Sequence, residues 1–366
     1  MPSELPTPKN VIVTQDPAEL LSYPLNPPVR SPLKRTGQGL RFVILQQPTK
    51  SGKDKVYTIP DALGSGGDTQ IGESRKSRVM PPGQTANPPE VPNDKCDFDK
   101  PPEGVDRKML EVDNIKPFGP MVHKLVYSRR HIEKLREIKP DDLPDAVVQF
   151  YEIAENGCRT FGAIFDGLAV GMNFGEYLRS GASQRHLHYQ VAGISPATYN
   201  PGDRLGALCQ AYRSVHPGED YLSDYEEALV AANLVVARAS NGRAFAFAPI
   251  SPRFKGEVQI MLTRREGQNG HILDTTPQER EALGELQYIL LERLDWLGCV
   301  ALNQLWYMTR FSTANTFGQR LIVSICPRTS IMAQYELLGY SVIDMMPWEA
   351  AATLRAAESL YFGLRP

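Results

Sequence analysis

Apolar residues along the middle of the chain change from a spacing of two to a helical spacing and back again. Residues 121–127 alternate from face to face of an extended backbone, which predicts a strand. A helix is predicted from Pro140 to about Glu155, with Asn156–Gly157 as its stop signal. The strands predicted to follow lie at about 159–165, 168–174 and His186–Gln190.

The same order of elements recurs later in the chain. Glu257–Thr263 predicts a strand, and Thr275 starts a capped helix that runs to Trp296 and ends at Gly298. Two strands follow, at about 299–311 and 319–326. The repeated order strand, helix, strand, strand predicts an internal duplication. Residues 200–240 between the two runs are predicted to be mostly helical, with a long helix over Tyr221–Ala239.

The first 105 residues have a different pattern, dense in Pro, Gly and short polar runs. Leu40–Leu45 is the clear strand candidate among them. We predict a loop-rich extension over residues 1–105 that wraps the surface or covers a site. Disorder is the competing prediction for residues 1–20 and 50–90.

Two histidines on one predicted strand are the strongest chemical signal. In His186-Leu187-His188-Tyr189-Gln190, both imidazoles and the Gln190 amide share one face, and the apolar residues occupy the other. Ser180-Gly181-Ala182-Ser183 precedes them, and such small residues let the backbone approach a ligand closely. An imidazole held in this way can attack phosphorus and carry the phosphoryl group covalently. The alternative is a hydrogen-bonded pair of histidines on the surface.

These residues carry a resemblance to a known family. Asn173, Ser180-Gly181-Ala182-Ser183 and His186-x-His188-x-Gln190 resemble the active-site signature of the galactose-1-phosphate uridylyltransferase branch of the histidine-triad (HIT) superfamily. That branch also contains dinucleoside tetraphosphate phosphorylases and GDP-hexose phosphorylases. The segment HLHYQ is most similar to the GDP-hexose phosphorylases, because uridylyltransferases usually have Pro where this chain has Leu187. The resemblance covers roughly residues 95–366.

The resemblance implies an α+β protein with a duplicated HIT-like fold, in which two antiparallel sheets each carry packed helices. The first half would span residues 106–200 and hold the histidine strand. The second half would span residues 201–366 and lack a catalytic histidine, because its last strand, within Gln319–Arg328, contains none.

The resemblance also assigns roles to individual residues. His188 would be the nucleophile, His186 would orient the strand or bind metal, and Gln190 would donate its amide to a phosphate oxygen. The phosphate would be bound by Gly181, Ala182, Ser183, Asn173 and Arg185, and the nucleoside by Asn114, Pro117 and Phe118. A structural zinc would be held by Cys96, Asp99, His131 and His186, with Asp99 in place of the Cys of the uridylyltransferases.

Gln190 distinguishes hydrolysis from transfer to a phosphate acceptor. HIT hydrolases have a third His at this position, which can pass a proton to the leaving group, whereas Gln cannot titrate. Three functions therefore remain. They are nucleotidyl transfer between a sugar nucleotide and a sugar phosphate, phosphorolysis of a nucleotide sugar or dinucleoside polyphosphate by inorganic phosphate, and nonenzymatic nucleotide binding.

Composition limits the classes of binding partner and indicates the cellular compartment. The chain has 40 basic and 42 acidic residues and a net charge of −2, which gives no support for a nucleic-acid or membrane partner. No secretory signal or membrane-spanning apolar run is visible, and five scattered cysteines are typical of a reducing cytoplasm. Two fused halves predict either a monomer that is a pseudo-dimer or a homodimer.

Overall fold

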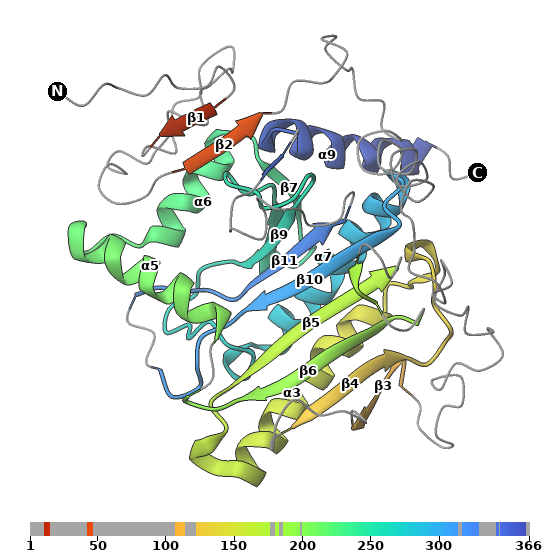
Figure 1. Cartoon of the computed structure of the whole chain (residues 1–366), viewed down its shortest axis with the longest axis vertical. Coiled ribbons are helices and arrows are strands. Elements are labelled where there is room, and N and C mark those ends of the chain that lie inside the picture. The colour runs from red at the N-terminus through yellow and green to blue at the C-terminus, as the bar shows by residue number, and fades with distance from the viewer. Residues whose placement is uncertain are drawn as a thin grey trace, which may run out of the picture.

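A single nine-stranded sheet forms the centre of the molecule (Figure 1). The computed structural model describes residues 11–14, 42–46, 107–113, 122–175, 180–182, 186–197, 200–313, 317–328, 342–343 and 345–363. Across the sheet the strand order is β3-β4-β6-β5-β10-β11-β9-β8-β7, and every neighbouring pair is antiparallel. The strands are β3 (Met109–Asp113), β4 (His123–Ser128), β5 (Gly167–Gly175), β6 (His188–Ile194), β7 (Val235–Arg238), β8 (Ala244–Phe247), β9 (Val258–Leu262), β10 (Ala301–Tyr307) and β11 (Ile322–Pro327).

In a second, three-stranded sheet, a strand from the carboxyl-terminal region pairs with a strand from the amino-terminal region. Strand β1 (Val11–Thr14) pairs antiparallel with β2 (Phe42–Gln46), and β12 (Val342–Ile343) pairs parallel with β2. Strand β2 overlaps the strand predicted at Leu40–Leu45. The rest of the predicted loop-rich extension lies almost entirely outside the described residues.

Two long helices cover one face of the large sheet, behind it in the view of Figure 1. They are α3 (Asp142–Phe161) and α7 (Pro277–Trp296). Tyr189 of β6 packs edge-on against Phe150 of α3, with ring centroids 5.0 Å apart. The apolar side chains of both runs of elements form one continuous core beneath these helices. The other helices in the described part of the chain are α5 (Pro201–Val215), α6 (Tyr221–Ala231) and α9 (Pro347–Gly363), with short 3-10 turns η3 (Leu135–Glu137), η4 (Gly162–Ile164) and η5 (Ile272–Asp274).

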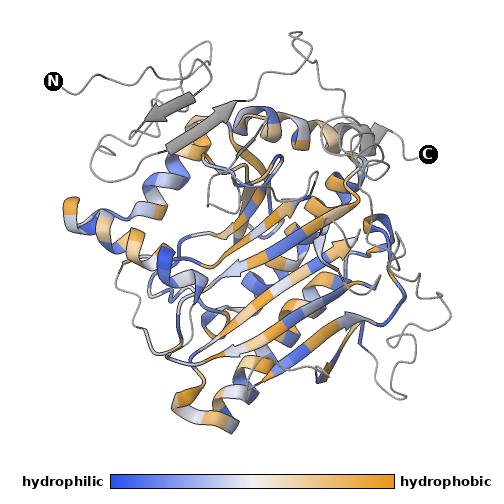
Figure 2. Ribbon diagram, in the orientation of Figure 1, coloured by the Kyte–Doolittle hydropathy of each residue, from blue (hydrophilic) through white to orange (hydrophobic). Residues whose placement is uncertain are grey.

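Figure 2 shows orange and blue positions alternating along the central strands. On β5, the apolar residues Leu168, Val170, Met172 and Phe174 are buried, while Ala169 between them is exposed. Alternation of this kind leaves one face of the strand for the helices and the other for polar groups. We call the face opposite α3 and α7 the open face.

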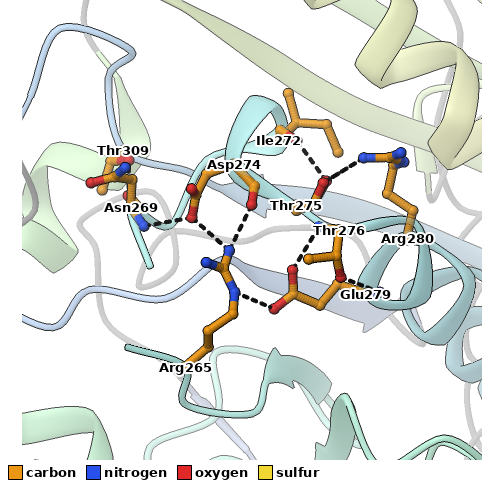
Figure 3. A network of polar contacts seen from close by, with 9 residues as sticks. All are labelled: Arg265, Asn269, Ile272, Asp274, Thr275, Thr276, Glu279, Arg280 and Thr309. Atoms are coloured by element: carbon orange, nitrogen blue, oxygen red, sulfur yellow. Dashed lines mark hydrogen bonds and ion pairs between the residues drawn. The ribbon is translucent and has the colours of Figure 1, made fainter. Parts of the chain in front are cut away.

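Both long helices start in the same way. In each case an arginine that follows a strand donates hydrogen bonds to the next 3-10 turn and to an acidic residue in the first turn of the helix. Arg130 donates to the Glu137 carbonyl and to the Asp142 carboxylate before α3. Before α7, Arg265 donates to the carbonyl and carboxylate of Asp274 and to Glu279 (Figure 3).

The start of α7 was visible in the sequence. Thr276 and Glu279 form a reciprocal capping box, in which the Thr276 hydroxyl accepts from the Glu279 N–H and the Glu279 carboxylate accepts from the Thr276 N–H. The predicted helix over Thr275–Trp296 is therefore confirmed, with Pro277 as its first residue.

Two local predictions were wrong at glycine and asparagine positions. Helix α3 continues through Gly157 to Phe161, and the 3-10 turn η4 follows it, so the strand predicted at 159–165 is absent; Gly157 provides space for the Phe165 ring inside the core. A Cβ atom at residue 157 would lie 2.3 Å from that ring. The helix predicted to reach Ala239 ends at Ala231, since Asn233 adopts a left-handed φ of 56° and the chain then enters β7.

The α+β class is confirmed, but the expectation of two separate antiparallel sheets was wrong. Strands β5 and β10 pair directly from Gly171–Leu305 to Gly175–Ala301, so the two runs of elements share one sheet. Edge strands that pair in this way gain hydrogen bonds that two isolated sheets would leave to water.

Two further observations concern the described residues only. No disulfide joins the cysteines found there, namely Cys158, Cys209, Cys299 and Cys326. Among the helices that the structure describes, none combines the length and the apolarity that crossing a bilayer would require.

Candidate active site

Strand β6 lies inside the sheet, hydrogen-bonded on one edge to β4 and on the other to β5. His188 is its first residue, directly opposite Tyr127 of β4. Because Tyr189 faces the helices, the side chains of His188 and Gln190 belong to the open face. The strand register therefore agrees with the predicted shared face for His188 and Gln190, but His186, the third residue of that prediction, lies before the strand.

The ring of His188 is held by its own backbone neighbourhood. Its Nδ1 atom lies 2.7 Å from the carbonyl oxygen of His186. A carbonyl only accepts hydrogen bonds, so Nδ1 carries the proton and Nε2 carries the lone pair of the neutral ring. Burial lowers the pKa of His188 below its usual range, and the hydrogen bond to the His186 backbone offsets part of that effect. The neutral imidazole is the form that can act as a nucleophile.

His186 lies just before the strand and points to a different neighbourhood. It is buried, and its Nε2 donates to the carbonyl oxygen of Ser128 at 2.5 Å. Its ring meets Tyr127 edge-on at 5.9 Å and His131 edge-on at 5.0 Å. The side chain thus ties the start of β6 to the end of β4.

Gln190 and Asn173 complete the polar part of the open face near His188. Gln190 pairs with Gly171 of β5, a residue that has no side chain of its own. Two residues further along this register, Asn173 lies beside His188. Both Asn173 and Gln190 are half-buried. Three groups capable of binding phosphate oxygens are therefore neighbours on two adjacent strands.

The turn before β6 is described for Ser180, Gly181 and Ala182. Gly181 has a φ of 77°, a left-handed conformation that a residue with a side chain rarely adopts. The Ala182 N–H donates to the Ser180 hydroxyl at 3.1 Å. A Cβ atom built on Gly181 would lie 3.9 Å from the side-chain nitrogen of Asn173, so the turn faces the Asn173 amide.

Several predicted site residues lie outside the described residues. They are Ser183 and Arg185 of the turn, Asn114, Pro117 and Phe118 of the nucleoside site, and Cys96 and Asp99 of the metal site. Their roles remain predictions.

Of the predicted metal ligands, the structure describes His131 and His186, and these two are neighbours. His131 also contacts Glu133, with Nε2 2.9 Å from the carboxylate. Since Nε2 of His186 donates to Ser128, Nδ1 is the atom of that ring suited to a metal. In the part of the chain that is described, no group of three or more potential ligands is assembled for a metal ion.

Two residues of the second run of elements reach this site and were not predicted. Asn303 of β10 pairs with Asn173, donating to its side-chain oxygen at 2.7 Å and to the Ser180 carbonyl at 2.7 Å. Arg328, just after β11, donates to the Asn303 side-chain oxygen at 3.1 Å. One signal for Asn303 was present in the sequence. Asn303 and Gln304 are adjacent polar residues in an otherwise apolar strand, and neighbouring residues of a strand point to opposite faces. One of the two must therefore place a polar side chain on the open face.

A pocket of about 200 Å³ lies at the other end of the strands. Its charges are largely compensated, since Arg320 pairs with Glu226, Arg265 with Asp274 and Arg264 with Asp220. The register places it about six residues along the sheet from the level of His188, roughly 20 Å away. The polar groups around His188 therefore form the better candidate site. The pocket is lined by Arg213, Asp220, Arg264, Arg265, Glu266, Gly267, Gln268, Gly318, Gln319 and Arg320.

No protein-family model matches the chain, and no curated protein matches its sequence. Solved structures do share the fold. An ADP-glucose phosphorylase from Arabidopsis thaliana, with bound ADP-glucose, has a TM-score of 0.63 at 15% identity, over 94% of this chain and 98% of that chain. A uridylyltransferase has a TM-score of 0.60 at 19% identity, over 77% and 95%. A GalT-like protein from Arabidopsis thaliana has a TM-score of 0.59 at 17% identity, over 68% and 83%.

The chain thus has the fold of the uridylyltransferase and ADP-glucose phosphorylase structures. The resemblance drawn from Asn173, the Ser180–Ser183 turn and His186–Gln190 is confirmed at the level of the fold.

Proposed function

We propose that this protein transfers a nucleoside monophosphate between a sugar nucleotide and a sugar phosphate, with His188 as the covalent carrier. The observation that carries the proposal is the 2.7 Å contact between Nδ1 of His188 and the His186 carbonyl. That contact leaves the lone pair on Nε2, at the start of an inner strand and beside Asn173. The fold shared with a uridylyltransferase and an ADP-glucose phosphorylase supports it.

The proposed reaction has two balanced steps. Nε2 of His188 attacks the α-phosphorus, and the bond from that phosphorus to the bridging oxygen breaks. The electron pair leaves with the sugar phosphate. An oxygen of the acceptor phosphate then attacks the same phosphorus, and the phosphorus–nitrogen bond returns its electron pair to Nε2. This order gives ping-pong kinetics.

Gln190 suits this exchange better than hydrolysis. The leaving group is itself a phosphate, which departs as an anion and needs no proton from the protein. An amide can donate to a phosphate oxygen as charge moves, but it cannot activate water as a titrating base. We propose that Gln190, Asn173 and the N–H groups of the Gly181–Ser183 turn bind the transferred phosphate, with Arg185 as a further phosphate contact.

Phosphorolysis is the second candidate. The chemistry at His188 would be the same, with inorganic phosphate as the acceptor and a nucleotide sugar or a dinucleoside polyphosphate as the donor. Leu187 between the two histidines favours it, through the likeness of HLHYQ to the GDP-hexose phosphorylases. The aligned ADP-glucose phosphorylase, which covers 94% of this chain, adds a phosphorylase of the same fold.

We also propose that residues 106–200 and 201–366 are two copies of one HIT-like half. The strand order on one side of the β5–β10 pair, β5-β6-β4-β3, corresponds to β10-β11-β9-β8 on the other. The matching arginine contacts of Arg130 and Arg265 at the starts of α3 and α7 support the same conclusion.

A structural zinc is a separate proposal. His131 and His186 would hold it together with Cys96 and Asp99, and its role would be to fasten the amino-terminal extension beside the site. Metal content of the purified protein, measured by mass spectrometry for the native chain and His131→Ala, tests it. Zinc in both proteins at equal amounts, or in neither, would count against this ligand set.

The first test of the reaction is the mass of the intact protein. The protein is mixed with UDP-, GDP- and ADP-sugars and with dinucleoside polyphosphates, without acceptor. We expect a gain of one nucleoside monophosphate, mapped to His188, with the donors that fit. His188→Gln should gain none, whereas His216→Gln, a histidine at the end of α5, should behave like the native chain.

The acceptor then separates the two candidates. Isolated adduct is chased with hexose 1-phosphate or with inorganic phosphate, and the acceptor that restores the native mass identifies the reaction. Loss of adduct to water alone would contradict both. Absence of adduct in folded protein with every donor would contradict covalent transfer through His188, and would point to direct displacement or to nucleotide binding without catalysis.

A further inference from the structure

The amide of Asn303 has only one orientation that its neighbours allow. Its Oδ1 accepts from Nη1 of Arg328 at 3.1 Å, and its Nδ2 donates to the Ser180 carbonyl at 2.7 Å. A guanidinium can only donate and a carbonyl can only accept, so oxygen and nitrogen of this amide cannot be exchanged. The second N–H of Asn303 is then directed at Oδ1 of Asn173, also at 2.7 Å.

The orientation of Asn303 determines that of Asn173. Because Oδ1 of Asn173 accepts from Asn303, its Nδ2 is presented on the other side of the amide. That side faces the turn, where a Cβ atom on Gly181 would lie 3.9 Å from Nδ2. Arg328, Asn303 and Asn173 thus form a chain of hydrogen bonds that all run in one direction. We call these three residues the amide chain.

Arg328 is itself held in place by contacts with two other residues of the second run of elements. Its backbone N–H donates to the Ala301 carbonyl at 2.8 Å, at the start of β10. Its guanidinium carbon lies 4.7 Å from the centre of the Phe254 ring, within the range of a cation–π contact. The cation at the far end of the amide chain therefore has a fixed position.

The same amide also holds the turn before β6. Ser180 is buried, and its carbonyl accepts from Asn303 while its hydroxyl accepts from the Ala182 N–H. A shift of Asn303 would move both a side-chain donor and the backbone of the turn at once.

We propose that Asn303 and Arg328 are positioning residues for the transferred phosphate. They would do so by directing the N–H groups of Asn173 toward it and by anchoring the Ser180–Ala182 turn. This inference rests on the proposed function and extends it, because it gives the half without a catalytic histidine a role in the chemistry of His188. Preorganised donors of this kind stabilise charge in the transition state without reorientation.

The experiment measures the rate of adduct formation at His188 and the donor concentration that half-saturates it. Asn303→Asp keeps the acceptor for Arg328 but loses both donated hydrogen bonds, and we expect the saturated rate to fall roughly 100-fold. Arg328→Met removes the group that fixes the amide, with an expected loss of roughly 10-fold and partial recovery in Arg328→Lys. The half-saturating concentration should change much less than the rate.

A double-mutant comparison separates positioning from simple destabilisation. In an Asn173→Ala background, Arg328→Met should reduce the rate by a smaller factor than in the native chain, because the side chain that it orients is already gone and only the anchoring of the Ser180–Ala182 turn is left to lose. Gln259→Leu is the matched control. It changes an open-face amide of β9 that contacts Glu257 and lies outside the amide chain, and its adduct rate should equal that of the native protein.

A second readout does not depend on the reaction. Selectively labelled asparagine allows the side-chain NH₂ resonances of Asn173 to be followed by NMR, and they should shift in Arg328→Met and stay in place in Gln259→Leu. Unchanged Asn173 resonances, or additive effects of Arg328→Met and Asn173→Ala, would overturn the inference. Absence of any adduct in the native chain would refute the proposed function while leaving the amide chain open to this NMR test.

Discussion

At His188, the carbonyl oxygen of His186 lies 2.7 Å from Nδ1, and this contact selects the nitrogen that can react. The two residues are two apart in sequence, so the geometry needs only the local turn into β6. His186 has a different task, because its own ring is directed to Ser128 and His131.

The tautomer of His188 is the first prediction at this scale. Long-range ¹H–¹⁵N NMR spectra of the native protein at neutral pH should show a protonated Nδ1 and an unprotonated Nε2. A protonated Nε2 would contradict the proposed nucleophile, since the lone pair would then face a carbonyl. His188→Gln serves to assign the signals.

His271 gives a prediction about pH and stability. It is buried, its Nδ1 has no hydrogen-bond partner among the described residues, and burial lowers its pKa despite the nearby Asp274. Below about pH 6.5 the unfolded chain binds a proton there that the folded chain does not. The free energy of unfolding should therefore fall as the pH decreases, until the folded pKa is reached.

Denaturant unfolding at several pH values measures this effect. In His271→Leu, the dependence of stability on pH below 6.5 should be smaller by up to about 1.4 kcal/mol per pH unit. An unchanged slope would mean that His271 takes up a proton in the folded protein.

At the scale of elements, ion pairs with buried or partly buried carboxylates stabilise the starts of α3 and α7. Glu279 has a side chain only 2% exposed and accepts from both Arg265 and the Thr276 backbone. Figure 3 shows these contacts together with the Asp274 carboxylate, which also accepts from the Asn269 N–H.

Replacing Glu279 should destabilise the protein. In Glu279→Ala, the Thr276 N–H loses its acceptor and Arg265 keeps only Asp274, so we expect a loss of about 2 kcal/mol in the free energy of unfolding. Glu281→Ala changes an exposed acid in the same helix and should cost less than about 0.5 kcal/mol. If both variants lost the same free energy of unfolding, the capping contacts of Glu279 would not contribute to stability.

The elements also show how far local sequence determines structure. The start of α7 could be predicted because Thr276, Pro277 and Glu279 are adjacent and act on one another. The end of α3 could not, because Gly157 stays helical to make room for Phe165, a contact fixed only by packing. The shared face of His188 and Gln190 could be predicted from their spacing, whereas Asn303 and Arg328 act on Asn173 from 130 or more positions away.

At the scale of the whole molecule, the pairing of β5 with β10 joins the two runs of elements into one sheet. The sequence predicted both runs but not their pairing, because strand alternation specifies faces and not neighbours. The core is likewise continuous across the pair.

Gly175 at the end of this pairing provides a test. It has a φ of 87°, and a Cβ atom there would lie 1.9 Å from the Val300 carbonyl oxygen. Gly175→Ala should lower the free energy of unfolding by roughly 3 kcal/mol or more. Gly242→Ala, at a φ of 71° with no atom within 4 Å of the added Cβ, carries the backbone strain alone and should cost about 1 kcal/mol.

Thermal unfolding followed by far-ultraviolet circular dichroism and by tryptophan fluorescence measures both variants. Because both runs of elements share one core, each protein should unfold in a single transition, with the same midpoint temperature from both probes. Two separate transitions in the native chain would contradict a shared core.

The placement of β6 between β4 and β5 has a consequence for motion. Its backbone is bonded on both edges, so its amides can exchange with deuterated water only when neighbouring strands separate. Those amides should be among the slowest to exchange in the protein. In the proposed mechanism His188 would then sit on a nearly fixed support through both half-reactions, and the change from leaving group to acceptor would require movement of the substrates and of the groups above the sheet.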